Sequence, residues 1–259
     1  MYAQTDGIWR CLPVARLAAL EPFLAHYRAV RDLEGRRRVA GAYYRGLPVV
    51  DRRDPHAAEW RIRRETYREL LRVCFATAPD AARVLDLGAG CGWLSHRLAE
   101  LGHHVVSLDV LDDAADGLGA VRHYAVRFPA VQADFDRLPF APAQFDVVVF
   151  NGSLHYAHDV AATLRGAQRV LAPGGALVVM DSPMFQSSAD GDAMMARRAD
   201  AVHGVGYVTH AGLDAVASAL GLRATFTPSH GPIGWRLRRQ IARLRLGRAP
   251  AAFGLWVAR

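Results

Sequence analysis

Lysine is missing from the 259-residue sequence, and asparagine occurs once, at Asn151. The 32 basic residues are therefore all arginines, and with 25 acidic residues the formal net charge is +7. Lysine and asparagine codons are both rich in adenine, so a GC-rich genome accounts for both absences. The basic charge is for that reason weak evidence for nucleic-acid binding, because part of it reflects codon usage.

Cysteine is also scarce. Cys11, Cys74 and Cys91 are odd in number, far apart and in no CxxC pair, which argues against disulfides and a structural zinc site and favours a reducing cytoplasm. The longest strand-like apolar run, 147–150, is far too short to span a bilayer. Residues 1–10 lack the basic start and apolar stretch of a signal peptide. We therefore expect a cytoplasmic protein without a metal site or a transmembrane segment.

From residue 83 onward, short apolar runs alternate with stretches of helical pattern. The predicted strands are 83–87, 104–109, 131–135, 145–151 and 176–181, and the runs 222–227 and 253–258 can extend the sheet. The four connections between the first five strands are each long enough for a crossover helix, which indicates that these strands are parallel. The sequence therefore predicts an α/β fold with a doubly wound, mostly parallel seven-stranded sheet.

The flanks of this region differ from it in pattern and in charge. Residues 1–80 are mostly helical in pattern, with helices expected at 14–35 and 59–76, and we expect them to form an N-terminal cap. They carry 15 arginines against 10 acids, residues 81–180 carry 7 against 10, and residues 181–259 carry 10 against 5. We expect the main domain to be 81–259, with lid insertions at about 182–210 and 228–252.

A basic amphipathic helix is expected within the second insertion, at 235–246. Leu237, Ile241 and Leu244 recur at i, i+4 and i+7, with arginines around them. Three roles remain open for it. The helix can pack its apolar face on the core, clamp an anionic substrate, or dock on an anionic membrane or RNA.

The most informative motif is a glycine-rich turn at residues 86–92, of the form D-x-G-x-G-x-G, between the first predicted strand and its helix. Glycines let the chain turn sharply and let a ligand lie against bare backbone. The helix that follows offers free N–H groups and a positive dipole end. The spacing differs from the G-x-G-x-x-G of dinucleotide sites, which disfavours a dehydrogenase.

Polar residues end the next three predicted strands. Asp109 lies 21 residues after Gly88, an offset at which a carboxylate can accept hydrogen bonds from both ribose hydroxyls. Asp134 offers a carboxylate for an adenine amino group, and Phe135 offers a ring beside the purine. Asn151 closes the fourth strand. The carboxyl ends of parallel strands are where open α/β sheets bind ligands, so we expect these residues to meet at one site.

Three stretches resemble the class I S-adenosylmethionine-dependent methyltransferases, in particular the branch that includes the ubiquinone and menaquinone biosynthesis enzymes. They are VLDLGAGCGWLSHRLAELGHHVVSLDV, ADFDRLPFAPAQFDVVVFNGSLHYAHD and RVLAPGGALVVMD, within residues 83–181. The resemblance implies that S-adenosylmethionine is the cofactor, held by Asp86, Gly88, Ala89, Gly90, Gly92, Asp109, Val110, Asp134, Phe135 and Asn151. In that scheme Asp109 holds the ribose, Asp134 and Val110 meet the adenine, and Asn151 meets the methionine end.

The residues after Asn151 narrow the reaction. They read Gly-Ser-Leu instead of the Pro-Pro-aromatic run of base amino-methyltransferases, and no cysteine follows the fourth or fifth strand. We expect O- or C-methylation of a small molecule, with an anionic substrate as one option. Two alternatives remain: an RNA or protein methyltransferase recruited by the arginine-rich flanks, and a non-catalytic partner protein that binds S-adenosylmethionine.

His155 and Tyr156 are the candidate catalytic residues, because they follow the fourth strand and could remove a proton from the acceptor. A general base is needed only when the nucleophile must lose a proton. The alternative for His155 is a histidine at a helix start that bonds to the backbone. His203, Tyr207 and His210 lie in the region where this family often builds a substrate lid.

Overall fold

The computed structural model describes residues 3–38, 40–76, 78–197, 203–229, 241, 244 and 250–259. The strands are β1 (Ala3–Thr5), β2 (Ile8–Arg10), β3 (Arg83–Leu87), β4 (His104–Asp109), β5 (Ala130–Gln132), β6 (Phe145–Asn151), β7 (Leu171–Met180), β8 (Met184–Phe185), β9 (Val208–Thr209), β10 (Ala224–Pro228) and β11 (Gly254–Ala258). The α-helices are α1 (Val14–Leu33), α2 (Gly41–Gly46), α3 (Ala57–Leu70), α4 (Trp93–Glu100), α5 (Val160–Val170), α6 (Ser188–Met195) and α7 (His210–Ala219). Shorter turns are η1 (Leu71–Phe75), which extends α3 as a π-helix, and the 3₁₀ helices η2 (Leu118–His123) and η3 (Leu154–Tyr156).

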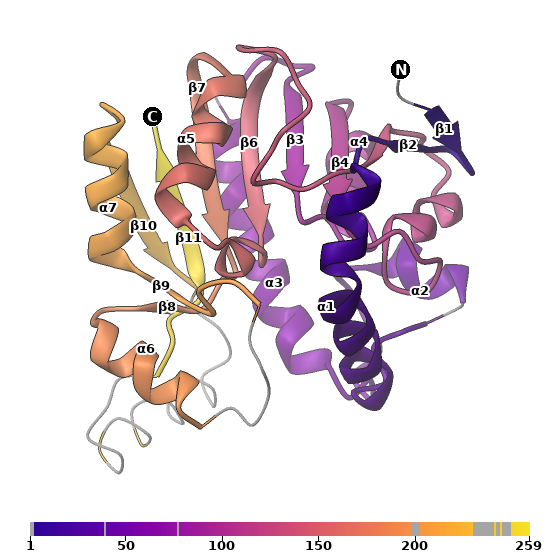
Figure 1. Cartoon of the computed structure of the whole chain (residues 1–259), viewed down its shortest axis with the longest axis horizontal. Helices are drawn as coiled ribbons and strands as arrows, with labels where there is room; N and C mark the ends of the chain where they lie inside the picture. The colour runs from indigo at the N-terminus through magenta and orange to yellow at the C-terminus, as the bar shows by residue number, and fades with distance from the viewer. Residues whose placement is uncertain are drawn as a thin grey trace.

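A nine-stranded sheet in the order β1-β2-β5-β4-β3-β6-β7-β11-β10 forms the centre of the molecule (Figure 1). The five pairings from β2 to β7 are parallel, while β1, β11 and β10 pair antiparallel. Seven of these strands, from β5 to β10 in sheet order, form the predicted sheet, so the mostly parallel α/β fold is confirmed. β5 ends earlier than predicted, at Gln132, so that Asp134 and Phe135 lie in the loop beyond it.

The alternation of side chains along each strand accounts for the helices on both faces. Leu85 and Leu87 of β3 belong to one core cluster, which includes buried residues of α5 and α7. Val84 of β3 belongs to a second cluster, which includes buried residues of α3 and α4. The strands are therefore buried on both sides, as expected for a parallel sheet between two helical layers.

The first two strands are an addition that the sequence analysis missed. β1 and β2 form a hairpin, and β2 pairs parallel to β5, so residues 3–10 extend the main sheet. The turn between them is Asp6-Gly7, with φ of 54° and 78°. Positive φ at both positions is the geometry of a tight hairpin turn, for which Asp-Gly is a strong local signal. The cap is thus helical only from α1 onward.

The C-terminal part carries the short parallel pair β8–β9 and helix α6, within the first predicted insertion. The expected basic helix at 235–246 lies outside the described residues except for Ile241 and Leu244, which are exposed. None of the helices that the structure describes is both long and apolar enough to cross a membrane. The division of the chain at residue 80 stays a prediction.

Candidate functional site

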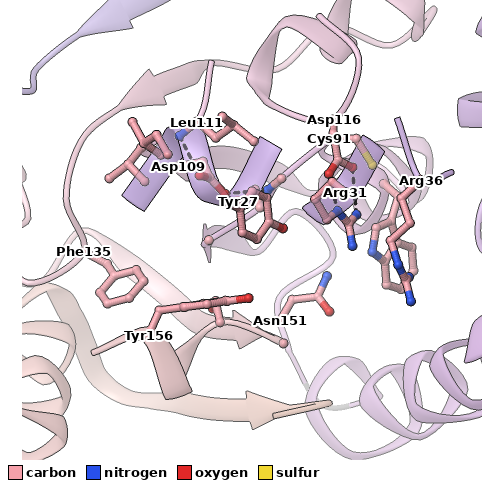
Figure 2. Close-up of a pocket in the computed structure, with 18 of the residues that line it drawn as sticks. Tyr27, Arg31, Arg36, Cys91, Asp109, Leu111, Asp116, Phe135, Asn151 and Tyr156 are labelled. Atoms are coloured by element: carbon pink, nitrogen blue, oxygen red, sulfur yellow. Dashed lines mark hydrogen bonds and ion pairs between the residues drawn. The ribbon is translucent and has the colours of Figure 1, made fainter. Parts of the chain in front are cut away.

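A cavity of about 150 Å³ lies at the carboxyl ends of the parallel strands and is lined by residues of α1 (Figure 2). The predicted residues that line it are Gly88, Ala89, Gly90, Asp109, Val110, Asp134, Phe135, Asn151 and Tyr156. They converge because β5, β4, β3 and β6 are adjacent and parallel, so their carboxyl ends share one edge of the sheet. The carboxylates of Asp109 and Asp134 therefore face one cavity.

Gly88 shows why the turn after β3 needs glycine. Its φ is +71°, and a Cβ placed there would stand 2.2 Å from the Cβ of Ser153. Ser153 is buried, lines the cavity and donates a hydrogen bond from its hydroxyl to the carbonyl of Leu87. The loop after β6 thus packs directly against bare backbone of the turn. The sequence carried no signal that assigned this role to Ser153.

Asp109 holds the glycine turn after β3 by a hydrogen bond and also lines the cavity. Its Oδ2 accepts a hydrogen bond from the backbone N–H of Gly90 at 2.7 Å, and its Oδ1 accepts one from Leu111 at 2.8 Å. Burial raises the pKa of Asp109 to about 6, and the two backbone N–H groups offset part of that effect. Each carboxylate oxygen can accept a second hydrogen bond, so both ribose hydroxyls of a nucleoside can be held here.

Asp134 already has a cationic partner that the sequence analysis did not anticipate. Arg16 of α1 donates from Nε to Oδ2 at 2.6 Å, and the backbone N–H of Asp136 donates to Oδ1 at 3.0 Å. A carboxylate has about four acceptor positions, so an adenine amino group can still be accepted beside Arg16. Phe135 packs edge-on against Phe150 with ring centroids 5.7 Å apart.

Asn151 points into the cavity with an unsatisfied amide oxygen (Figure 2). The residue is only 6% exposed, and its Oδ1 has no hydrogen-bond partner within the described part of the chain. A buried polar atom left without a partner costs about 1–3 kcal/mol, so this oxygen is suited to accept a donor from a ligand. The ammonium group of a methionine moiety is such a donor, and this fits S-adenosylmethionine.

The structure separates Asp86 and Gly92 from the other predicted cofactor residues, because these two are not among the described residues that line the cavity. Asp86 is fully buried, and its Oδ2 accepts a hydrogen bond from the Ser95 hydroxyl of α4 at 2.8 Å. Gly92 is the N-cap of α4, and a Cβ there would meet Val121 and Phe128. Both residues support the glycine turn on the side away from the cavity. Their places in β3 and at the start of α4 direct them away from the edge of the sheet where the cavity lies.

Asp86 carries a testable pH dependence. Burial raises its pKa from 3.8 to about 7, so between these values the folded protein holds a proton that the unfolded chain has lost. Its contribution to stability therefore falls as pH rises through this window. Compared with the native protein, Asp86→Asn should gain roughly 2–3 kcal/mol of unfolding free energy between pH 5 and pH 8, as measured in urea. The exposed Asp32→Asn serves as control, and parallel pH curves for Asp86→Asn and the native protein would refute this role.

Of the two candidate catalytic residues, Tyr156 is among the described residues that line the cavity and His155 is not. Tyr156 lines the cavity, where its ring meets Phe23 and Tyr27 of α1 at 5.8 and 6.1 Å. His155 is not among the described cavity-lining residues; its ring packs on Tyr156 at 4.2 Å.

From the first insertion, His203 lines the cavity and stacks on Phe23 at 4.1 Å, whereas Tyr207 and His210 do not line it in the described structure. Within the described residues, no group of three or more His, Cys, Asp or Glu side chains could hold a metal ion.

The cap contributes four arginines that the sequence analysis did not assign to the site: Arg16, Arg31, Arg36 and Arg63. Arg31 forms an ion pair with Asp116, to which its Nε and Nη2 donate hydrogen bonds of 2.5 and 2.8 Å (Figure 2). No local pattern could have indicated these positions, since arginines are spread over the whole of residues 1–80.

Comparison with known proteins agrees with this geometry. Residues 85–179 match the sequence model of a family described as a methyltransferase domain. This matched region is similar to a methyltransferase domain and covers less than half of the chain. It contains the glycine turn and the tips of β4 and β6, and the cap that roofs the cavity lies outside it.

A curated relative of the methyltransferase domain is a malonyl-[acyl-carrier protein] O-methyltransferase of Erwinia pyrifoliae. It is 34% identical over 115 residues, which cover 42% of this chain and 43% of that protein. The chain thus matches about two fifths of this relative's length.

Two solved structures share the fold. The 1,6-didemethyltoxoflavin-N1-methyltransferase of Burkholderia thailandensis has a TM-score of 0.55 and 19% identity, with 100% of this chain and 94% of that chain covered. An S-adenosylmethionine-dependent methyltransferase of Mesorhizobium loti has a TM-score of 0.54 and 22% identity, with 78% and 98% covered. The overall fold is therefore that of S-adenosylmethionine-dependent methyltransferases.

Proposed function

We propose that the protein is an S-adenosylmethionine-dependent methyltransferase that methylates oxygen or carbon of a small molecule. One observation carries the proposal: Asp109, Asp134 and Asn151 meet in one cavity against the glycine turn after β3. These residues offer acceptors for ribose, adenine and ammonium groups along the edge of the sheet. The methyltransferase-domain match supports the same reaction.

The protein's contribution to such a reaction is alignment. S-adenosylmethionine supplies an activated methyl group, and holding donor and acceptor in line accounts for about 7–11 kcal/mol of barrier in good cases. Asp109 fixes the ribose, and Asn151 holds the methionine end. Phe23 and Tyr27 of α1 line the cavity, and their rings give it an apolar wall opposite the strand ends. We assign Tyr156 to the positioning of the acceptor, and His155 to support of the Tyr156 ring.

A small acceptor suits the cavity better than RNA or protein. Most arginines of the basic cap pair with carboxylates of the chain itself, which reduces their use as a nucleic-acid surface. The paired residues are Arg10, Arg16, Arg28, Arg31, Arg36, Arg37, Arg38, Arg63, Arg64, Arg68 and Arg72. We also assign the protein to the cytoplasm, since Cys11, Cys74 and Cys91 are free thiols.

The test is transfer of a labelled methyl group. The purified protein should bind S-adenosylmethionine with micromolar-class affinity in calorimetry and, with methyl-labelled cofactor, should label a compound in the small-molecule fraction of an extract of its source organism. Label in RNA or protein, removed by nuclease or protease, would instead favour a macromolecular acceptor. Tight binding without any transfer would favour the non-catalytic partner protein.

A further inference from the structure

Two arginines of the cap lie side by side in the cavity wall. Arg36, which follows α1, donates from Nη2 to Oε2 of Glu59 at 2.6 Å, and Arg63 of α3 donates from Nη2 to Oε1 of the same carboxylate at 2.9 Å. Burial alone would raise the pKa of Glu59, but Arg63 and Arg36 lower it to about 2. The shared carboxylate therefore stays ionised and holds the two guanidinium groups together.

The pair lies at the methionine end of the cavity. Nη1 and Nη2 of Arg63 are 4.0 and 3.9 Å from the point where a Cβ on Gly152 would stand, so the guanidinium is beside the tip of β6. The adenine end lies at the tips of β4 and β5, and β3 with its glycine turn separates β4 from β6 in the sheet. The arginine pair is thus placed where an acceptor would approach the sulfur of the cofactor.

Much of the hydrogen-bonding capacity of the pair is uncommitted. A guanidinium group carries five N–H donors, so the two groups have about ten. Within the described residues they make two bonds to Glu59 and one from Arg36 to Glu34. Arg63 also stacks on Trp60 at 5.2 Å, which fixes the plane of its guanidinium. Arg31 differs in its partner, because a single buried carboxylate, that of Asp116, accepts from both its Nε and its Nη2.

Three phenols and one thiol that line the same cavity are poor proton acceptors. Burial raises the pKa of the phenols of Tyr27, Tyr43 and Tyr44, and it raises the pKa of the Cys91 thiol to about 12. These side chains are protonated at neutral pH. An acceptor that arrives already deprotonated suits such surroundings, since it needs no general base.

We propose that the acceptor is a carboxylic acid, bound as its carboxylate by Arg36 and Arg63, and that its carboxylate oxygen is methylated. A guanidinium fork matches a carboxylate in shape and charge. A lone pair of the oxygen forms the O–CH₃ bond while the S–CH₃ bond breaks, and the electron pair of that bond stays on sulfur. The products are a methyl ester and S-adenosylhomocysteine, and no proton moves. This inference rests on the proposed methyltransferase function.

Binding tests the arginines without turnover. With saturating S-adenosylhomocysteine, phenylacetate, benzoate and hexanoate are titrated against their amides. We expect at least one carboxylate to bind tenfold tighter than its amide. Arg63→Gln and Arg36→Gln should abolish this preference and leave affinity for S-adenosylhomocysteine within threefold, whereas Arg68→Gln, exposed on the same helix, should change neither. Equal binding of all acids and amides would overturn the proposal. So would a tenfold loss of S-adenosylhomocysteine affinity in Arg63→Gln, because the arginine would then hold the cofactor's own carboxylate.

The chemistry of the labelled product separates this inference from the proposed function. A methyl ester releases labelled methanol in mild alkali, whereas ethers and C-methyl groups keep the label. Alkali-labile label that falls at least tenfold in Arg63→Gln supports the carboxylate acceptor. Alkali-stable label would overturn the carboxylate and leave the methyltransferase standing. Absence of any label would count against the methyltransferase itself.

Discussion

Asp109→Ala is expected to weaken binding of S-adenosylhomocysteine by roughly 100-fold or more. Hydrogen bonds to a charged group contribute about 1.5–3 kcal/mol each, and this carboxylate can accept one from each ribose hydroxyl. Two such bonds correspond to about two to four powers of ten in affinity. The substitution also releases the backbone N–H groups of Gly90 and Leu111, which Asp109 holds in place.

Calorimetry measures the loss of affinity for S-adenosylhomocysteine, and a urea titration of the same sample measures any loss of folding stability. Asp109→Asn keeps an acceptor oxygen and a similar shape, so it should retain more affinity than the alanine variant. Asp32→Asn removes an exposed carboxylate of α1 and should bind like the native protein. If folded Asp109→Ala binds S-adenosylhomocysteine as tightly as the native protein, the cofactor assignment of this cavity is wrong.

Gly88→Ala is expected to destabilise the protein by about 2–5 kcal/mol and to abolish measurable cofactor binding. A Cβ at this position would stand 2.2 Å from the Cβ of Ser153, so the loop after β6 would have to move away from the turn. The positive φ of +71° adds strain of its own. The displaced loop begins with Gly152 directly after Asn151 of β6, and both residues line the cavity.

Gly102→Ala is the matched control, because Gly102 also has a positive φ (+90°) but has no described atom within 4 Å of the added Cβ. The loss of unfolding free energy in Gly102→Ala therefore measures the backbone strain alone. Unfolding in urea should therefore show a clearly larger loss for Gly88→Ala than for Gly102→Ala, and Ser153→Gly should restore part of the difference. Equal losses for the two glycine variants would mean that the contact with Ser153 is unimportant.

Most of the sheet and much of the site could be predicted from local patterns. Residues 104–109 and 145–151 were predicted as strands with the bounds that β4 and β6 have, because apolar runs between helical stretches are typical of buried parallel strands. The hairpin β1–β2 was missed because its strands have three residues each, too few to show a period. Only the Asp6-Gly7 turn signalled it.

The direction of the Asp86 side chain could not be predicted from the motif. A motif states that an acid precedes the glycines, but it does not state which way the carboxylate points. Its side chain lies under α4 and accepts from Ser95, nine residues later, so its direction depends on how the helix packs on the sheet. Asp109 and Asn151 end their strands at the open edge, and this is why their exposure to the cavity could be expected.

The sequence by itself determined the alternating strands, the glycine turn and the acids at the strand ends, because each of these depends on residues that are close along the chain. Only the tertiary structure decided what closes the cavity. Arg16 meets Asp134 across 118 positions, and Arg36 and Arg63 share Glu59 at the tip of β6. Such contacts depend on the direction in which α1 and α3 cross the sheet, and that direction is set by packing of the whole core, which no local pattern encodes.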